Sequence, residues 1–171
     1  MDLSFVLTLL VFFPVLGMVV LAFIPNTQEK TIKLVGFLST LPTLLLSLAV
    51  YFHYLAGKSL EDFSVVQKWI QFGGFGEMDD NFFAVHYELG LDGFAMIMVL
   101  LTSIIATLAA VASIHIKKEW KGYFMLFLLL EVGMLGVFAA ENLILFFIFF
   151  EVTLIPMFFL IGKWGYFEKE K

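Results

Sequence analysis

The chain has 171 residues, of which 61% are hydrophobic and 15% are charged, and its mean hydropathy is +0.99. Soluble domains contain about 45–50% apolar and about 25% charged residues, so this composition indicates a membrane protein. The absence of cysteine excludes a disulfide scaffold and any thiolate-bound iron–sulfur or zinc site. A net charge of −5 without any arginine argues against nucleic-acid binding.

Five apolar runs follow one another along the chain, each close to the roughly 20 residues that a bilayer-spanning helix needs. They cover residues 3–24, 32–56, 91–116, 122–140 and 143–161. The first run is too long for a cleaved signal peptide and lacks a basic leading segment, so we interpret it as a retained helix. The sequence therefore predicts an all-α membrane protein with five transmembrane helices in a single domain, residues 1–171.

One long polar connection, residues 57–90, separates the second run from the third, and it is acidic, with six carboxylates against two lysines. Glycines at 73–76 predict a turn, and residues 81–89 predict a short extended segment. The acidic cluster at 77–81 lacks the twelve-residue ligand spacing of a calcium loop, so we interpret the connection as solvated outer surface.

The lysines are distributed unequally between the connections. Eight lie in the connections after the first and third spans and in the C-terminal tail, and two lie in the long connection after the second span. Because loops on the cytoplasmic or matrix side carry the excess of positive charge, we predict the N-terminus outside and the C-terminus inside. No presequence is visible, so insertion into a bacterial inner membrane is the simplest localisation.

Three prolines, Pro14, Pro42 and Pro156, fall within predicted spans. Each removes a backbone donor and frees a carbonyl at membrane depth. Membrane helices tolerate proline generally, and we prefer this interpretation for Pro14 and Pro42.

Glu131 and Glu151 lie near the middle of the last two spans, where a carboxylate costs several kcal/mol and is a functional-site candidate by default. The turn between these spans centres on Glu141 and Asn142, about ten residues from each acid. At about 1.5 Å per residue, this is about 15 Å along each helix, or half of the hydrocarbon thickness. We therefore predict that both acids lie at the same midplane depth on adjacent antiparallel helices.

The chemistry expected at this depth is proton transfer. Desolvation disfavours the anion, so such a carboxyl can hold a proton and lose it when a cation or water approaches. Pro156 strengthens the prediction for Glu151, because its ring breaks the helix and frees the carbonyl of Val152 beside the acid. The alternative is that an acid bonds a hydroxyl such as that of Thr153 and locks the helices together, and it weighs more for Glu131.

Residues 149–165 read FFEVTLIPMFFLIGKWG. This segment resembles the fifth-helix signature of the M-type (ND4-like) membrane subunit of proton-translocating NADH:quinone oxidoreductase, respiratory complex I. Residues 136–143, GVFAAENL, and residues 90–93, GLDG, also resemble that subunit. The resemblance runs over the whole chain and is strongest from residue 89 onward. Its Glu-x-x-Leu-Ile-Pro core favours the M-type over related subunits and over cation/proton antiporter subunits.

The resemblance implies roles for particular residues. Glu151 occupies the position of the family's membrane glutamate, which pairs with a lysine on a later helix and takes up and releases protons. The family does not uniformly place an acid at Glu131, so its role as a possible second proton carrier rests on its depth alone. Asp92 matches the Asp-Gly of the motif, where we expect a helix-start or interface role.

The chain is much shorter than the family's members, and all ten of its lysines lie at span ends or in loops. The lysine partner of Glu151 is therefore expected outside this chain, either in a longer or split subunit of which this is the N-terminal part, or in another chain. The expected partners are the remaining helices of that subunit, other membrane subunits of complex I and the lipid bilayer. No cofactor is expected here, since NADH, FMN, iron–sulfur clusters and quinone belong to partner subunits.

The resemblance and the midplane acids together predict the N-terminal part of a proton-pumping membrane subunit. Such a chain belongs to a translocase, in which NADH oxidation and quinone reduction occur elsewhere in the complex. Two alternatives stay open. One is a cation/proton antiporter subunit, and the other is a non-catalytic scaffold or assembly relative whose acids fix helix packing through a contact face at Gly133 and Gly136.

Overall fold

The computed structural model describes residues 3–72, 83–116 and 119–165. The helices in this part of the chain are α1 (Ser4–Phe23), α2 (Glu29–Leu38), α3 (Leu41–Leu55), α4 (Gly93–Ala112), α5 (Trp120–Ala139) and α6 (Leu143–Trp164). Short 3₁₀ turns cover Glu61–Phe63 and Ser113–His115, and the strands are β1 (Val65–Phe72) and β2 (Phe83–Leu89). Five helical segments are long and apolar enough to cross a membrane, as predicted: Phe5–Phe23, Glu29–Leu55, Gly93–His115, Trp120–Ala139 and Leu143–Trp164.

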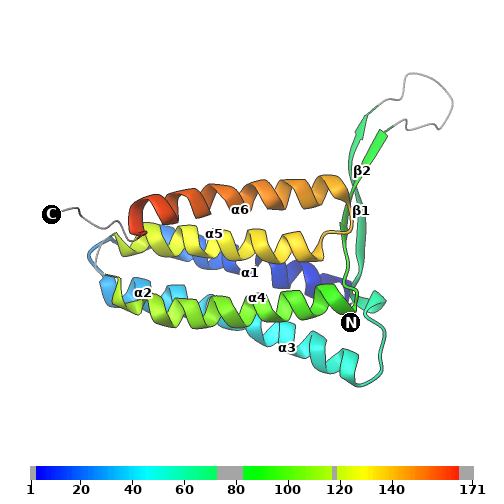
Figure 1. Ribbon diagram of the computed structural model, residues 1–171, viewed down its shortest axis with the longest axis horizontal. Helices are drawn as coiled ribbons and strands as arrows, with labels where there is room; N and C mark the ends of the chain where they lie inside the picture. The colour runs from blue at the N-terminus through cyan, green and yellow to red at the C-terminus, as the bar shows by residue number, and fades with distance from the viewer. Residues whose placement is uncertain (1–2, 73–82, 117–118, 166–171) are drawn as a thin grey trace.

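The helix α5 lies at the centre of the bundle, and α1, α2, α4 and α6 all pack against it. The α1–α2 connection, the start of α5 and the end of α6 lie at one end of the bundle (Figure 1). We call this the lysine-rich end, because four described lysines lie there: Lys30 and Lys33 on the first half of α2, Lys121 at the start of α5 and Lys163 at the end of α6. The start of α1 and the ribbon of β1 and β2 lie at the opposite end, which we call the ribbon end (Figure 1).

The second predicted span consists of two helices, α2 and α3, rather than one. The hydroxyl of Ser39 donates to the carbonyl of Val35 at 2.7 Å, and that of Thr40 donates to the carbonyl of Phe37 at 2.8 Å. Such local bonds compete with the helical ladder and favour an end to the helix. Pro42 then lies in the first turn of α3, where its missing N–H costs nothing. Pro42 is therefore a helix-start residue, and not the mid-helix residue that we predicted.

The strands β1 and β2 form an antiparallel ribbon within the long connection, residues 57–90. The sequence predicted only the second of these two strands. β2 confirms the predicted extended segment over its described residues, 83–89, whereas β1 was not predicted. The ribbon is tied to the turn between α5 and α6, because Gly90 N donates to Ala139 O at 2.9 Å and Glu141 N donates to Glu88 O at 3.1 Å. The predicted turn at 73–76 and the acidic cluster at 77–81 lie outside the described residues.

The ribbon also contacts α1. The phenol of Tyr87 on β2 donates to Thr8 Oγ1 on α1 at 3.4 Å. Burial raises the pKa of Tyr87 above its usual value, and the hydrogen bond to Thr8 opposes this shift in part. Two separate contacts therefore fix the ribbon over the ends of α1, α5 and α6.

Candidate functional site

Glu131 lies on the central helix α5 and is only 2% exposed. Neither of its carboxylate oxygens has a hydrogen-bond partner among the described residues. The side chain lines a cavity of about 170 Å³ between α4 and α5, together with Thr102, Ala106 and Ala109. The Thr102 hydroxyl donates to the carbonyl of Met98 at 2.8 Å instead of to the acid. An unpartnered carboxyl at this depth costs free energy, so it is a candidate for function rather than for stability.

Glu151 lies on α6 and is exposed on the surface of the five-span bundle. It makes no hydrogen bond or ion pair with any residue that the structure describes. Phe147, Leu154, Ile155 and Phe158 lie three, four or seven residues from it and are exposed as well. Residues at this spacing share one side of a helix, so the acid lies within an apolar outer face of α6.

The contact between α5 and α6 corrects the predicted alignment of the two acids. A side chain at Gly133 would meet backbone atoms of Thr153 at 3.1 and 3.2 Å, and one at Gly136 would meet the ring of Phe149. With this register, Glu151 lies nearer the level of Leu135 than that of Glu131, an offset of about one helical turn. Glu131 faces the cavity beside α4, whereas Glu151 faces out of the bundle. The structure does not bring the two acids together.

Pro156 is buried within α6, and the helix continues through it from Leu143 to Trp164. We predicted that Pro156 breaks the helix, but α6 continues past it. The ring still removes the N–H that would have bonded the Val152 carbonyl. The hydroxyl of Thr153 donates to the carbonyl of Phe149 at 2.9 Å. The alternative interpretation was that one of the acids bonds a hydroxyl such as that of Thr153. Within the described residues, neither Glu131 nor Glu151 makes a hydrogen bond with Thr153.

Two helix starts at the ribbon end confirm and extend the predictions for this region. Asp92 Oδ1 accepts a hydrogen bond from Ala95 N at 2.6 Å and caps α4, which confirms the helix-start role. Asn142 Oδ1 accepts from Ile144 N at 2.9 Å and caps α6. The cap at Asn142 was missed, although an asparagine directly before an apolar run is its usual signal.

Buried hydroxyls on α3 and α4 were also missed. The Oγ atoms of Ser47 and Ser103 lie 2.6 Å apart, and Thr43 Oγ1 is buried without a hydrogen-bond partner in the described part of the chain. Thr43 and Ser47 are four residues apart and so share a face of α3, a signal hidden within a long apolar run. These hydroxyls give the contact between α3 and α4 a polar centre.

Comparison with known proteins shows what the chain is similar to. No family model matches the chain. It is 32% identical over 157 residues to "NADH-ubiquinone oxidoreductase chain 4" of Arabidopsis thaliana and 32% identical over 163 residues to "NADH-quinone oxidoreductase subunit M" of Rhodobacter capsulatus. These matches cover 91% and 93% of this chain but 30% of each relative.

The chain is a homologue of the N-terminal part of M-type subunits. The "NAD(P)H-quinone oxidoreductase chain 4, chloroplastic" of Chlorokybus atmophyticus, 34% identical over 164 residues, is a further relative. The chain spans about 30% of the length of the curated relatives it matches. This homology confirms the resemblance seen in the sequence, and with five apolar spans the M-type homologue is an integral, multi-pass membrane protein.

Proposed function

We propose that the chain forms the N-terminal, five-span part of a proton-pumping membrane subunit of an NADH:quinone oxidoreductase, and that Glu151 carries protons at mid-membrane. The observation that carries this proposal is the identity to chain 4 and subunit M proteins over about nine tenths of the chain. The coupled redox reaction, from NADH through FMN and iron–sulfur clusters to quinone, belongs to partner subunits. The described residues offer no group of three or more potential metal ligands for such chemistry.

The position of Glu151 supports the assignment. A carboxylate that faces acyl chains is costly, so the outer face of α6 requires a cover in the assembled protein. The described lysines of the spans lie at their ends, at Lys30, Lys33, Lys121 and Lys163. The resemblance assigns Glu151 a lysine partner on a later helix, and none of these four lysines pairs with it, so in this proposal the cation comes from helices beyond the five spans, either of the same subunit or of a neighbouring one. Proton uptake and release at Glu151 then follow the approach and withdrawal of that cation.

Glu131 is the second proton-carrying candidate of this proposal. It lies about one helical turn from the level of Glu151 and faces the opposite side of the α5–α6 pair. In this proposal a proton therefore does not pass directly between the two carboxyls, and it reaches Glu131 through the cavity beside α4. The two acids act as separate stations rather than as a carboxylate pair.

The test is Glu151→Gln in the assembled complex, with Glu61→Gln on the exposed 3₁₀ turn as the matched control. Glutamine keeps the shape and removes the exchangeable proton, so we expect proton pumping in vesicles to fall at least about tenfold while the complex still assembles. Glu61→Gln is expected to pump normally.

Two other outcomes would contradict the proposal. Normal pumping in the Glu151→Gln variant would remove Glu151 from the proton path. Loss of the membrane arm instead of pumping would favour the scaffold interpretation, in which the acid only fixes helix packing. For the antiporter interpretation, the deciding observation is the neighbouring genes: a cluster of antiporter genes, without dehydrogenase and quinone-site subunits, would favour it.

A further inference from the structure

At the lysine-rich end, the described lysines fall into two classes. Lys121 donates to two carbonyls at the C-terminal end of α1, that of Ala22 at 3.0 Å and that of the capping residue Ile24 at 2.9 Å, and Lys163 pairs with Glu119. These two ammonium groups therefore stabilise the protein itself. Lys30 and Lys33 on α2 line a separate groove on the surface of the bundle, together with apolar side chains, and Lys30 has no ion pair with a described residue.

The groove has a volume of about 240 Å³ and is lined by Lys30, Lys33, Leu34, Phe37 and Ile114. Lys30 is exposed and has no ion pair with a described residue. Lys33 is held in position by Glu29 and the ring of Trp120. The groove therefore has two ammonium groups and three apolar side chains.

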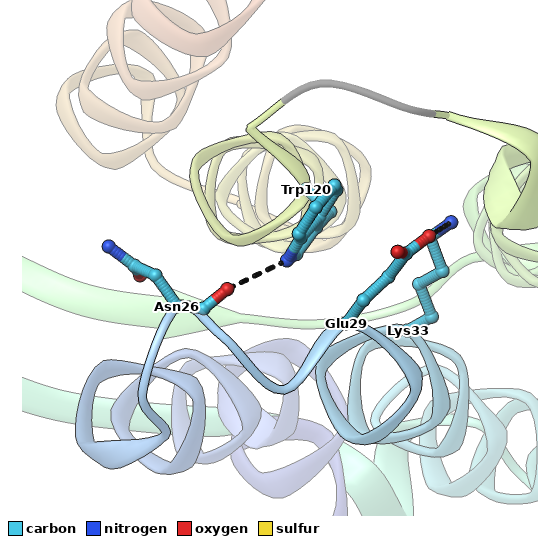
Figure 2. A network of polar contacts seen from close by, with 4 residues as sticks. All are labelled: Asn26, Glu29, Lys33 and Trp120. Carbon is cyan, nitrogen blue, oxygen red and sulfur yellow. Dashed lines mark hydrogen bonds and ion pairs between the residues drawn. The ribbon is translucent and has the colours of Figure 1, made fainter.

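Figure 2 shows what fixes Lys33. Its Nζ lies 2.5 Å from Glu29 Oε1 and 5.8 Å from the centre of the Trp120 ring. The indole of Trp120 in turn donates to the carbonyl of Asn26 at 3.3 Å. Because one carboxylate uses only one of the three ammonium hydrogens, Lys33 keeps donors for a second anion.

An apolar track continues from the groove toward the middle of the bundle. Leu34 and Leu38 on α2 are four residues apart and both are exposed. On the antiparallel span that consists of α4 and the following 3₁₀ turn, Ile114, Val111 and Leu108 are three residues apart in succession, and all three are exposed. Side chains at these spacings share a helix face, so both helices present apolar surface in the direction that leads away from the lysines.

We propose that this groove is a binding site for an anionic phospholipid, with its phosphate at Lys30 and Lys33 and an acyl chain along the apolar track. Two lysines and Glu29 give the groove a net charge of +1, which matches one phosphodiester. Basic groups at the mouth of an apolar groove between membrane helices are the arrangement that recognises acidic headgroups. Trp120 lies beside Lys33 at the start of α5, and indole rings favour the headgroup region of a bilayer.

The proposed lipid site can be tested directly with photoactivatable lipids. The full chain, with any subunits that copurify with it, is labelled with phosphatidylglycerol or phosphatidylcholine analogues of equal chain length, and the labelled peptides are identified. We expect phosphatidylglycerol to label residues 30–38 and 108–116 about tenfold more than phosphatidylcholine does. The double variant Lys30→Gln/Lys33→Gln should reduce this labelling to the phosphatidylcholine level. The matched control, Lys58→Gln/Lys68→Gln, removes two lysines from the other end and should leave it unchanged.

The variant Lys30→Arg/Lys33→Arg keeps both charges and should keep the labelling. If the double glutamine variant does not accumulate, the single variant Lys30→Gln can replace it, because no described residue pairs with Lys30. Labelling by phosphatidylglycerol should then fall several-fold. Equal labelling by the two lipids, or unchanged labelling in the glutamine variants, would overturn the proposal. So would displacement of the probe by inorganic phosphate, because a lipid site requires the acyl chain. Labelled partner protein in place of lipid at these peptides would identify a protein interface instead.

Discussion

Glu131 differs from the other described glutamates in having neither solvent nor a partner. Glu29 and Glu119 each pair with a lysine at the lysine-rich end, and Glu151 is exposed. Both oxygens of Glu131 are buried without a hydrogen bond to any described residue. A carboxyl in this setting opposes folding, because its lost hydration is not replaced by protein donors.

This setting predicts opposite effects of Glu131 substitutions on stability and on pumping. Glu131→Met keeps a similar length without polar atoms, so it should not lower the stability of the complex and should raise it by about 1–3 kcal/mol. Glu131→Gln and Glu131→Met should both reduce proton pumping, but less than Glu151→Gln does. Thermal unfolding of the purified complex and proton uptake in vesicles measure the two effects.

A fall in stability with both substitutions would show that Glu131 holds the helices together through a contact outside the described residues. A pumping loss as severe as that of Glu151→Gln would make Glu131 an equal member of the proton path. Unchanged pumping would remove it from the path.

The sequence was sufficient to find both acids, because a charge inside an apolar run is visible without a structure. It was not sufficient to say which way they face. The helix α5 contacts four other helices, so apolar residues are required on all of its sides. Its sequence therefore has no amphipathic pattern that would show which neighbouring helix Glu131 faces. The register of α6 against α5 depends on where Gly133 meets Thr153, which a count from the turn at Glu141 and Asn142 cannot supply.

Among the elements, α5 and α6 form a close contact at a glycine. Gly133 lets the backbone of α6 approach, because a Cβ there would lie 2.5 Å from Thr153 Oγ1 and within 3.2 Å of two backbone atoms. Small residues at such contacts are the usual basis of close helix packing in membranes. This contact sets the offset between Glu131 and Glu151.

Gly133→Ala should therefore destabilise the protein by about 1–3 kcal/mol, because backbone atoms cannot move aside as a flexible side chain can. Gly162→Ala is the matched control, since Gly162 is also helical, on α6, and a Cβ there meets nothing within 4 Å. The control should be neutral or slightly stabilising. The readout is the difference in unfolding midpoint between the two variants, and equal midpoints would contradict the close contact.

Two elements escaped prediction for physical reasons that particular residues illustrate. The run at 32–56 is apolar throughout, so hydropathy alone does not show that α2 ends at Leu38. The local signal was the pair Ser39 and Thr40, which comes shortly before Pro42. The hydroxyls of Ser39 and Thr40 donate to backbone carbonyls, which favours an end to the helix. β1 carries polar residues such as Gln67 and Lys68, and it forms a strand because it pairs with β2, which is a non-local interaction.

At the scale of the whole molecule, charge and architecture agree. The described ends of the spans alternate between the lysine-rich end and the ribbon end, as five antiparallel spans require (Figure 1). The proposed lipid groove lies at the lysine-rich end, and the helix caps at Asp92 and Asn142 lie at the ribbon end. The two ends therefore meet different chemical surroundings, and which one faces the cytoplasm is a separate question.

We predict that the lysine-rich end faces inward, because it carries the excess of positive charge. The chain contains no cysteine, so single introduced cysteines report their side of the membrane without background from the chain itself. Ser59→Cys lies at the ribbon end, after α3, and Thr27→Cys lies in the α1–α2 connection, and both positions are exposed. In spheroplasts, whose inner membrane is intact, a membrane-impermeant maleimide should label Ser59→Cys. It should label Thr27→Cys only after the inner membrane is permeabilised. The reverse pattern would place the N-terminus inside, and it would move the proposed lipid groove to the outer leaflet.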